Sequence, residues 1–111
     1  MTKPLTRRLE FIQEKGVMRA LDIANILSVR PETVLRWNQG KASPHPQTER
    51  LLMELCFVVE RMADLYEPEE ARLWISSRQH GLNGAVPADL IRADRAEEVL
   101  KVNSKLYART L

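Results

Sequence analysis

Cysteine, aromatic residues and long apolar runs are all scarce in this sequence of 111 residues. The single cysteine, Cys56, has no second cysteine to pair with, and its place in the apolar run 55–59 predicts a small buried side chain. No apolar run approaches the roughly 20 residues of a membrane-spanning helix, and the N-terminus shows no signal-peptide pattern. These absences predict a cytoplasmic protein without an intrachain disulfide or a membrane span.

The sequence also lacks the residue patterns that are typical of enzyme active sites. The two histidines, His45 and His80, have no cysteine or carboxylate at metal-ligand spacing. No glycine-rich phosphate loop follows a strand, and no nucleophile–base pair can be assigned from spacing. The acidic residues Glu67, Glu69 and Glu70 are explained by the positive end of a helix that begins there. The sequence therefore predicts no catalytic residue, no metal site and no cofactor, and hence a protein that is not an enzyme.

The composition is that of a folded, helical chain. Hydrophobic residues make up 44% of the sequence and charged residues 29%, which excludes a disordered polypeptide. Apolar residues recur at helical spacing, and no convincing pair of strands is present. We expect an all-α protein with an N-terminal helix-turn-helix bundle, a long central helix and a small C-terminal helical module. The expected boundaries are residues 1–45, 46–66 and 67–111.

Residues 20–40 are the most informative segment, because they predict two helices joined by a three-residue turn. Val34 and Trp37 are three residues apart and so face the same core from the second helix. Pro31 suits the first turn of that helix, and Gly40 is expected to be its C-cap. Helix pairs of this kind enter the major groove of DNA.

The outward face of the second helix carries side chains that bond base edges and phosphates. The predicted DNA-binding residues are Arg30, Thr33, Arg36, Gln39 and Lys41. Residues 1–50 hold nine Lys and Arg against five Asp and Glu, a charge of +4, while residues 51–111 hold eight against ten, a charge of −2. This polarity favours binding of operator DNA by the first half. Two alternatives stay open: an ordinary helical hairpin, and a helix-turn-helix that no longer binds DNA, since Glu32 and Leu35 share its outward face.

Two longer helices are expected around this unit. The first covers residues 4–15, ends at Gly16 and is expected to pack across the back of the helix-turn-helix. The second runs from about residue 47 to 65 and has two apolar stripes. The stripes are Leu51, Leu55, Val58, Met62 and Leu65 in one, and Leu52, Val59 and Tyr66 in the other. A helix that is apolar on two sides is either a homodimer seam or a core helix wrapped by the rest of the chain, and the sequence favours neither.

The last third of the chain predicts three short elements. Pro68 begins a short helix, and residues 78–84 form a loop whose Asn-Gly step requires a left-handed backbone. Residues 86–91 form a further short helix. Asp94 is the expected N-cap of the last helix, whose apolar positions continue to near the C-terminus.

The order of these features resembles the toxin-binding domain of the Xre/MbcA/ParS antitoxin family. A short helix with an aromatic residue, a Leu-x-Gly turn, a Pro-x-x-Leu motif and a closing helix follow one another over residues 67–106. Each piece alone is a weak signal, but the ordered set directly after a helix-turn-helix is specific. The residues carried over, with the role of shaping the module, are Leu82, Asn83, Gly84, Pro87 and Leu90. Asn83 stands where the family often has a glycine, and Asn also tolerates a left-handed backbone.

The resemblance implies the antitoxin of a type II toxin–antitoxin pair. The implied toxin has a RES domain and destroys NAD, and the antitoxin is implied to be a helical dimer that represses its own operon. The expected partners are therefore a RES-domain toxin, operator DNA and a second copy of the chain. The alternative function is a stand-alone dimeric helix-turn-helix transcription regulator with no toxin partner.

The end of the last helix combines basic and aromatic residues on an expected short, mobile segment. The predicted toxin-binding residues are Lys101, Lys105, Leu106, Tyr107 and Arg109. A toxin whose substrate is a dinucleotide phosphate should have a cleft that accepts cations. The hypothesis is that this tail enters that cleft and excludes NAD. The alternative is a frayed, solvated helix end.

Overall fold

The computed structural model of the chain describes residues 4–110. Within that range the chain forms seven α-helices and one 3₁₀ turn, without any β-strand. The elements are α1 (Pro4–Lys15), α2 (Ala20–Leu27), α3 (Pro31–Asn38), α4 (Pro46–Ala63), α5 (Pro68–Ser76), η1 (His80–Leu82), α6 (Pro87–Arg92) and α7 (Ala96–Thr110). The expected all-α class is confirmed. None of the helices within residues 4–110 is both long enough and apolar enough to cross a membrane.

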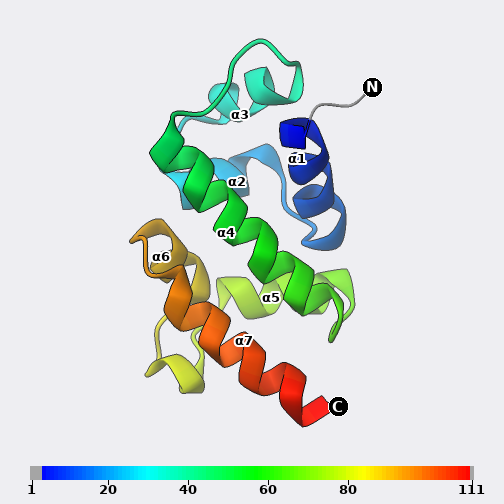
Figure 1. The fold of residues 1–111 in the computed structure, drawn as a ribbon, viewed down its shortest axis with the longest axis vertical. Helices are drawn as coiled ribbons and strands as arrows, with labels where there is room; N and C mark the ends of the chain where they lie inside the picture. The colour runs from blue at the N-terminus through cyan, green and yellow to red at the C-terminus, as the bar shows by residue number, and fades with distance from the viewer. Residues whose placement is uncertain (1–3, 111) are drawn as a thin grey trace.

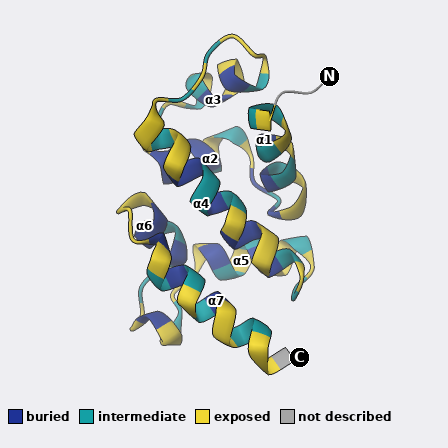
Figure 2. Cartoon of the chain, in the orientation of Figure 1, coloured by how far each residue is buried: buried dark blue, intermediate teal, exposed yellow. Residues whose placement is uncertain are grey.

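Helix α4 is the centre of the molecule. Figure 1 shows it crossing the fold diagonally, with α1 packed on one side and α7 lying alongside it on the other. Its buried residues come from both apolar stripes and are Leu51, Leu52, Leu55, Val58, Val59 and Met62. The chain's own helices therefore cover both stripes (Figure 2). Of the two alternatives, α4 is the wrapped core helix, and these stripes cannot also form a homodimer seam.

Helices α2 and α3 form the expected pair with a short turn between them. Ile23 and Leu27 of α2 and Val34 and Trp37 of α3 are buried in the common core. Ser28 turns the chain by adopting a left-handed conformation with a φ of 58°. The inward positions Val34 and Trp37 of α3 were therefore predicted correctly from their spacing.

Two helix ends differ from the prediction. The C-cap of α3 is Gln39, and Gly40 is the next residue, with a φ of 72°. Asp94 is not the N-cap of α7, because it has a φ of 61° and α7 begins only at Ala96. Instead Asp94 closes the end of α6, and its N–H donates to the carbonyl of Ile91 at 3.0 Å. Asp is one of the few residues with a side chain that tolerate this left-handed position.

The N-terminal and C-terminal parts of the chain share one core. Helix α6 packs on α2 as well as on α7, and the guanidinium of Arg92 joins them by donating to the carbonyl of Asn25 at 2.8 Å. The same side chain pairs with Asp89 at 2.8 Å. The boundaries 1–45, 46–66 and 67–111 do not divide the chain into separately packed units, because helices on either side of them share one core. They stay a prediction about which segment carries which function.

Candidate functional site

The predicted site residues lie on two surfaces at opposite ends of the molecule. Helix α3 lies near one end and the C-terminal end of α7 lies at the other (Figure 1). The first surface holds the predicted DNA-binding residues and the second holds the predicted toxin-binding residues. The two predicted surfaces therefore do not overlap.

The α3 surface presents most of its predicted side chains to solvent. Arg30, Arg36, Gln39 and Lys41 are exposed, whereas Thr33 is half-buried. Arg30 directly precedes α3, and its side chain makes no capping hydrogen bond. The turn after α3 brings Lys41 back toward the helix, since its N–H donates to the carbonyl of Arg36 at 2.9 Å.

The cationic side chains of the α3 surface form no ion pairs with carboxylates of the described residues. Among the described residues, the ion pairs engage Arg8, Arg50, Arg92 and Arg95, and none involves Arg30, Arg36 or Lys41. Such unpaired cations attract phosphates. Leu35 lies on the same helix with 48% of its surface exposed, which suits an apolar contact such as a thymine methyl group.

The turn that shapes the C-terminal module has the geometry its sequence requires. Asn83 and Gly84 have φ values of 56° and 82°, the left-handed region expected from the Asn-Gly step. Leu82 is buried beneath the turn, and Pro87 and Leu90 of α6 are buried beside it. Leu82, Pro87 and Leu90 therefore belong to the core, whereas Asn83 and Gly84 form the exposed turn.

Gln79 closes this turn, and the sequence analysis did not identify it. Its carbonyl accepts the N–H groups of Leu82 at 3.0 Å and Gly84 at 2.9 Å, and its N–H donates to the carbonyl of Ala85 at 3.0 Å. Its side-chain amide donates to the carbonyl of Trp74 at 2.9 Å. A single polar residue before a Gly-rich turn has no spacing signature, so only the folded loop reveals its role.

The end of α7 forms one side of a groove. Three of the five predicted toxin-binding residues, Lys105, Leu106 and Arg109, line a groove of about 380 Å³. The opposite wall comes from the α5–η1 region and includes Trp74, Gln79 and His80. The lining combines apolar side chains with polar and basic ones, which suits a partner segment that has both apolar and acidic side chains. The sequence analysis missed the opposite wall, because those residues lie far from α7 in the chain.

The other two predicted toxin-binding residues lie elsewhere on α7. Lys101 is exposed one helical turn before Lys105. Tyr107 faces α4, and the Arg61 guanidinium lies 5.6 Å from the centre of its ring, within cation–π range. The tail is also not a separate segment, since α7 continues to Thr110. The expected mobile tail is therefore part of a continuous helix.

The described residues contain no group of three or more His, Cys, Asp and Glu side chains that could hold a metal ion. Cys56 is half-buried, and its burial, followed by the nearby Glu60 carboxylate, raises the pKa of the thiol. A thiol whose pKa is raised is mostly protonated at neutral pH and is a poor nucleophile. Cys56 packs against the core as expected, but it is half-buried where the sequence predicted a buried side chain.

Comparisons with known proteins agree on one group of relatives. The chain is 29% identical over 79 residues to the mycobacterial cidal antitoxin MbcA of Mycobacterium bovis and of Mycobacterium tuberculosis, which covers 71% of this chain and 70% of each relative. It also matches a chain in the crystal structure of the M. tuberculosis MbcT–MbcA toxin–antitoxin complex, with a TM-score of 0.86, 23% identity and 99% coverage of both chains. No protein-family model matches the chain.

Proposed function

We propose that this chain, which is 29% identical to the antitoxin MbcA over 79 residues, is the antitoxin of a toxin–antitoxin pair and inactivates its toxin by direct binding. The observation that carries the proposal is the likeness to MbcA in both sequence and fold. The order of helix, Leu-Asn-Gly turn, Pro-x-x-Leu motif and closing helix is consistent with it. The toxin that this resemblance implies has a RES domain and degrades NAD.

The α7 end of the groove is the proposed toxin-blocking surface. Lys105 and Arg109 are exposed and have no carboxylate partner within residues 4–110. Dinucleotide sites place donors at the phosphates and a carboxylate at a ribose hydroxyl, and it is that carboxylate with which Lys105 and Arg109 would pair. Basic side chains at the end of a rigid helix would occupy such a cleft in competition with NAD. Helix α7 supplies that rigidity, which a mobile tail would lack.

The first experiment is co-expression of the tagged chain with the protein encoded by the neighbouring gene, followed by affinity capture and sizing. We expect a stoichiometric complex that restores growth and preserves cellular NAD. Lys105→Glu combined with Arg109→Glu leaves α7 intact and should weaken the complex at least about tenfold, because reversed charges repel at a complementary interface. Arg7→Glu, an exposed cation at the far end of the molecule, is the matched control and should bind normally.

Removal of residues 104–111 tests the same surface more coarsely. If the truncated chain still neutralises the toxin fully, α7 does not block the cleft and the blocking surface lies elsewhere. Absence of any complex with the neighbouring protein, together with specific binding to the chain's own promoter, would instead favour the stand-alone regulator.

Autorepression is the second proposed role, and the α3 surface supports it. Arg36 is exposed in the last turn of α3 and forms no ion pair within the described residues. If Arg36 reads a base, Arg36→Ala should weaken binding to the natural operator by about 1–3 kcal/mol. Arg78→Ala, an exposed arginine outside this surface, is the control. Unchanged operator affinity of the Arg36 variant, measured at one fixed salt concentration, would remove Arg36 from the reading face.

A further inference from the structure

Helix α5 has an open face in addition to the one that it buries in the core. Ala71 and Ile75 are buried, whereas four other residues of α5 line a groove of about 360 Å³. These residues recur at the i, i+3, i+4 and i+7 positions of one helix face and are Glu70, Leu73, Trp74 and Ser77. Leu73 is 58% exposed, the highest value among the large hydrophobic side chains of residues 4–110. The centre of this face is therefore apolar and open to solvent.

Helix α7 presents a face with the same spacing. Four of its residues line the groove of about 380 Å³ described above, and they are Val102, Lys105, Leu106 and Arg109. Trp74 and Gln79 line both grooves, so the two join into one, with α5 along one side and α7 along the other. This combined surface is called the α5–α7 groove below.

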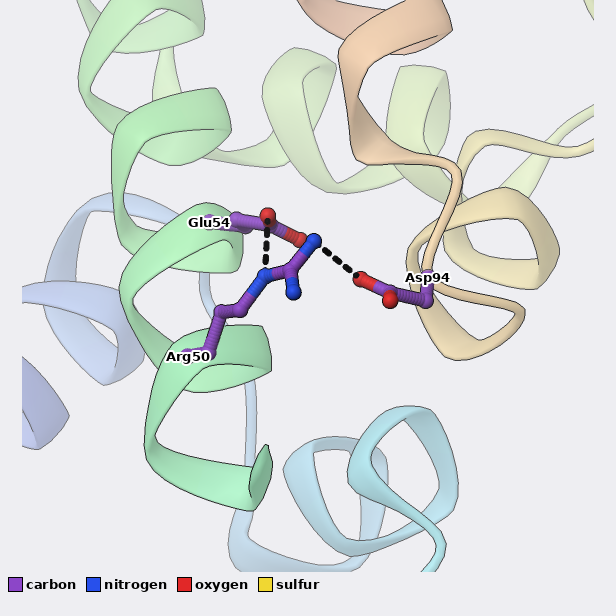
Figure 3. A network of polar contacts seen from close by, with 3 residues as sticks. All are labelled: Arg50, Glu54 and Asp94. Carbon is purple, nitrogen blue, oxygen red and sulfur yellow. Dashed lines mark hydrogen bonds and ion pairs between the residues drawn. The ribbon is translucent and has the colours of Figure 1, made fainter. Parts of the chain in front are cut away.

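Both walls of the α5–α7 groove are held by contacts within the chain. The side-chain amide of Gln79 donates to the carbonyl of Trp74, in the last turn of α5, at 2.9 Å. On the other side, Arg50 of α4 donates to Glu54 at 3.4 Å and pairs with Asp94, just before α7, at 3.1 Å (Figure 3). A groove whose walls are already ordered loses little conformational entropy when a partner binds.

Charge is unevenly distributed along the α5–α7 groove. Glu70 lies in the part that Leu73 lines, and Lys105 and Arg109 lie in the other part. The Glu70 carboxylate accepts the N–H of Glu67 at 3.0 Å, but within residues 4–110 no ion pair involves Glu70, Lys105 or Arg109. One end of the groove is therefore acidic, its middle is apolar and its other end is basic.

We propose that the α5–α7 groove holds an amphipathic helix of the toxin, from the rim of the cleft that α7 blocks. The inference rests on the proposed antitoxin function and names the part of the toxin that this chain recognises. Apolar residues on successive turns of the toxin helix pack against Leu73 and Leu106. The charges fix its direction: a basic residue lies against Glu70, and the opposite, acidic end lies beside Lys105 and Arg109, nearest the cleft.

The walls of the groove favour a helix of a different protein as the occupant. The backbone N–H and C=O groups of α5 and α7 are already used within these helices, so an extended segment finds no strand edge with which to pair. The carboxylate of Glu70 repels the phosphates of a nucleic acid. A second copy of the chain fits poorly, because a two-fold contact centred on the groove sets one concave surface against another.

The affinity of the purified chain for the protein encoded by the neighbouring gene tests the apolar centre. We expect Leu73→Ser to weaken the complex at least about tenfold, as loss of an anchor at the centre of an interface does. Leu21→Ser is the matched control and should bind normally, because Leu21 is 56% exposed but lies on α2. Circular dichroism of both variants confirms that the helices are retained.

The outcomes separate this inference from the proposed function. If the original chain binds and Leu73→Ser binds equally well, the toxin does not occupy the α5–α7 groove, while the antitoxin function stands. If the original chain does not bind the neighbouring protein at all, both are overturned.

Glu70→Gln tests the acidic end while keeping the helix cap, since glutamine also accepts the N–H of Glu67. Loss of the charge should weaken the complex about threefold at low salt, and this difference should shrink as salt is added. Glu69→Gln is the control, because Glu69 is exposed on another face of α5 and should leave the affinity unchanged. Equal effects of the two variants, or no effect of Glu70→Gln, would overturn the proposed direction.

A photoreactive amino acid in place of Leu73 identifies the occupant directly. In the complex of full-length proteins it should cross-link to a toxin peptide whose apolar residues recur at helical spacing and which carries a Lys or Arg at one end. The same amino acid in place of Leu21 should not cross-link to that peptide. Cross-links from position 73 to another copy of this chain, or to a toxin segment that forms no helix, would overturn the proposal.

Discussion

Asn103 is the one buried polar residue among the hydrophobic side chains of the described core. It is fully buried on α7, and its side-chain amide donates to the sulfur of Met62 on α4 at 3.2 Å. A thioether is a weak acceptor, and the amide oxygen of Asn103 has no hydrogen-bond partner among the described residues. Burial of an unsatisfied oxygen lowers stability. Asn103 follows the buried Val99 by four residues, so helical spacing places both on the inward face of α7.

The substitution Asn103→Leu should therefore stabilise the chain. Leu has a similar shape and removes the unsatisfied oxygen, so we expect the free energy of unfolding to rise by about 1 kcal/mol. Urea denaturation followed by circular dichroism measures this change. Ser104→Ala, on the exposed side of the same helix, should change stability little. A clear loss of stability in the Leu variant would mean that Asn103 makes interactions worth more than its desolvation.

At the level of single elements, the need for glycine in the turn between η1 and α6 comes from the backbone conformation and not from a lack of room for a side chain. A Cβ added at Gly84 would meet no atom within 4 Å, but its φ is 82°. At Gly81, two residues before Asn83, the nearest atom would be a methyl group of Val102 at 3.5 Å, an ordinary contact, and no positive φ is involved. The two glycines therefore differ in strain and not in available volume.

This difference predicts that the same substitution is destabilising at Gly84 and nearly neutral at Gly81. Gly84→Ala should destabilise the chain by about 1 kcal/mol, since Ala does not favour a left-handed conformation. Gly81→Ala should stay within about 0.5 kcal/mol of the original chain. Thermal and chemical denaturation of both variants provide the comparison. Equal effects at the two positions would show that the turn does not hold its left-handed residues under strain.

Across the whole molecule, the packing joins all three predicted segments. Val58 and Met62 of α4 are buried together with Val99 of α7 and Ile91 of α6 in one hydrophobic core. The hydrogen bond from Arg92 to the backbone of Asn25 links α6 to α2. A helix that loses the neighbour covering its apolar face has little stability of its own.

We therefore expect neither fragment 1–66 nor fragment 67–111 to fold alone. The full chain should unfold in a single cooperative transition, as single domains of this size do, whereas each fragment should show reduced helical content and no sharp transition. Circular dichroism during urea titration distinguishes these outcomes, and a mixture of the two fragments is the control. A cooperative transition in the isolated fragment 67–111 would show that the C-terminal module is an independent domain.

Local patterns were sufficient to predict the helices and their inward faces, because helical periodicity depends only on residues a few positions apart. The extent of α1, the place of Pro31 in the first turn of α3, the inward positions Val34 and Trp37 and the left-handed Asn-Gly step all follow from such local rules. The all-α class and the likeness to MbcA could likewise be inferred from the order of these short motifs.

The arrangement of distant segments could not be inferred, since it depends on which faces meet. Packing of α1 and α7 on α4 decided that both apolar stripes are internal. The same packing sends Tyr107 toward Arg61 and the other flank of α7 toward Trp74 and Gln79. Asp94 closes α6 instead of starting α7, because its left-handed backbone serves the preceding helix. Sequence periodicity specifies which side of a helix is apolar, but only the folded chain specifies which neighbour covers that side and which side remains for a partner.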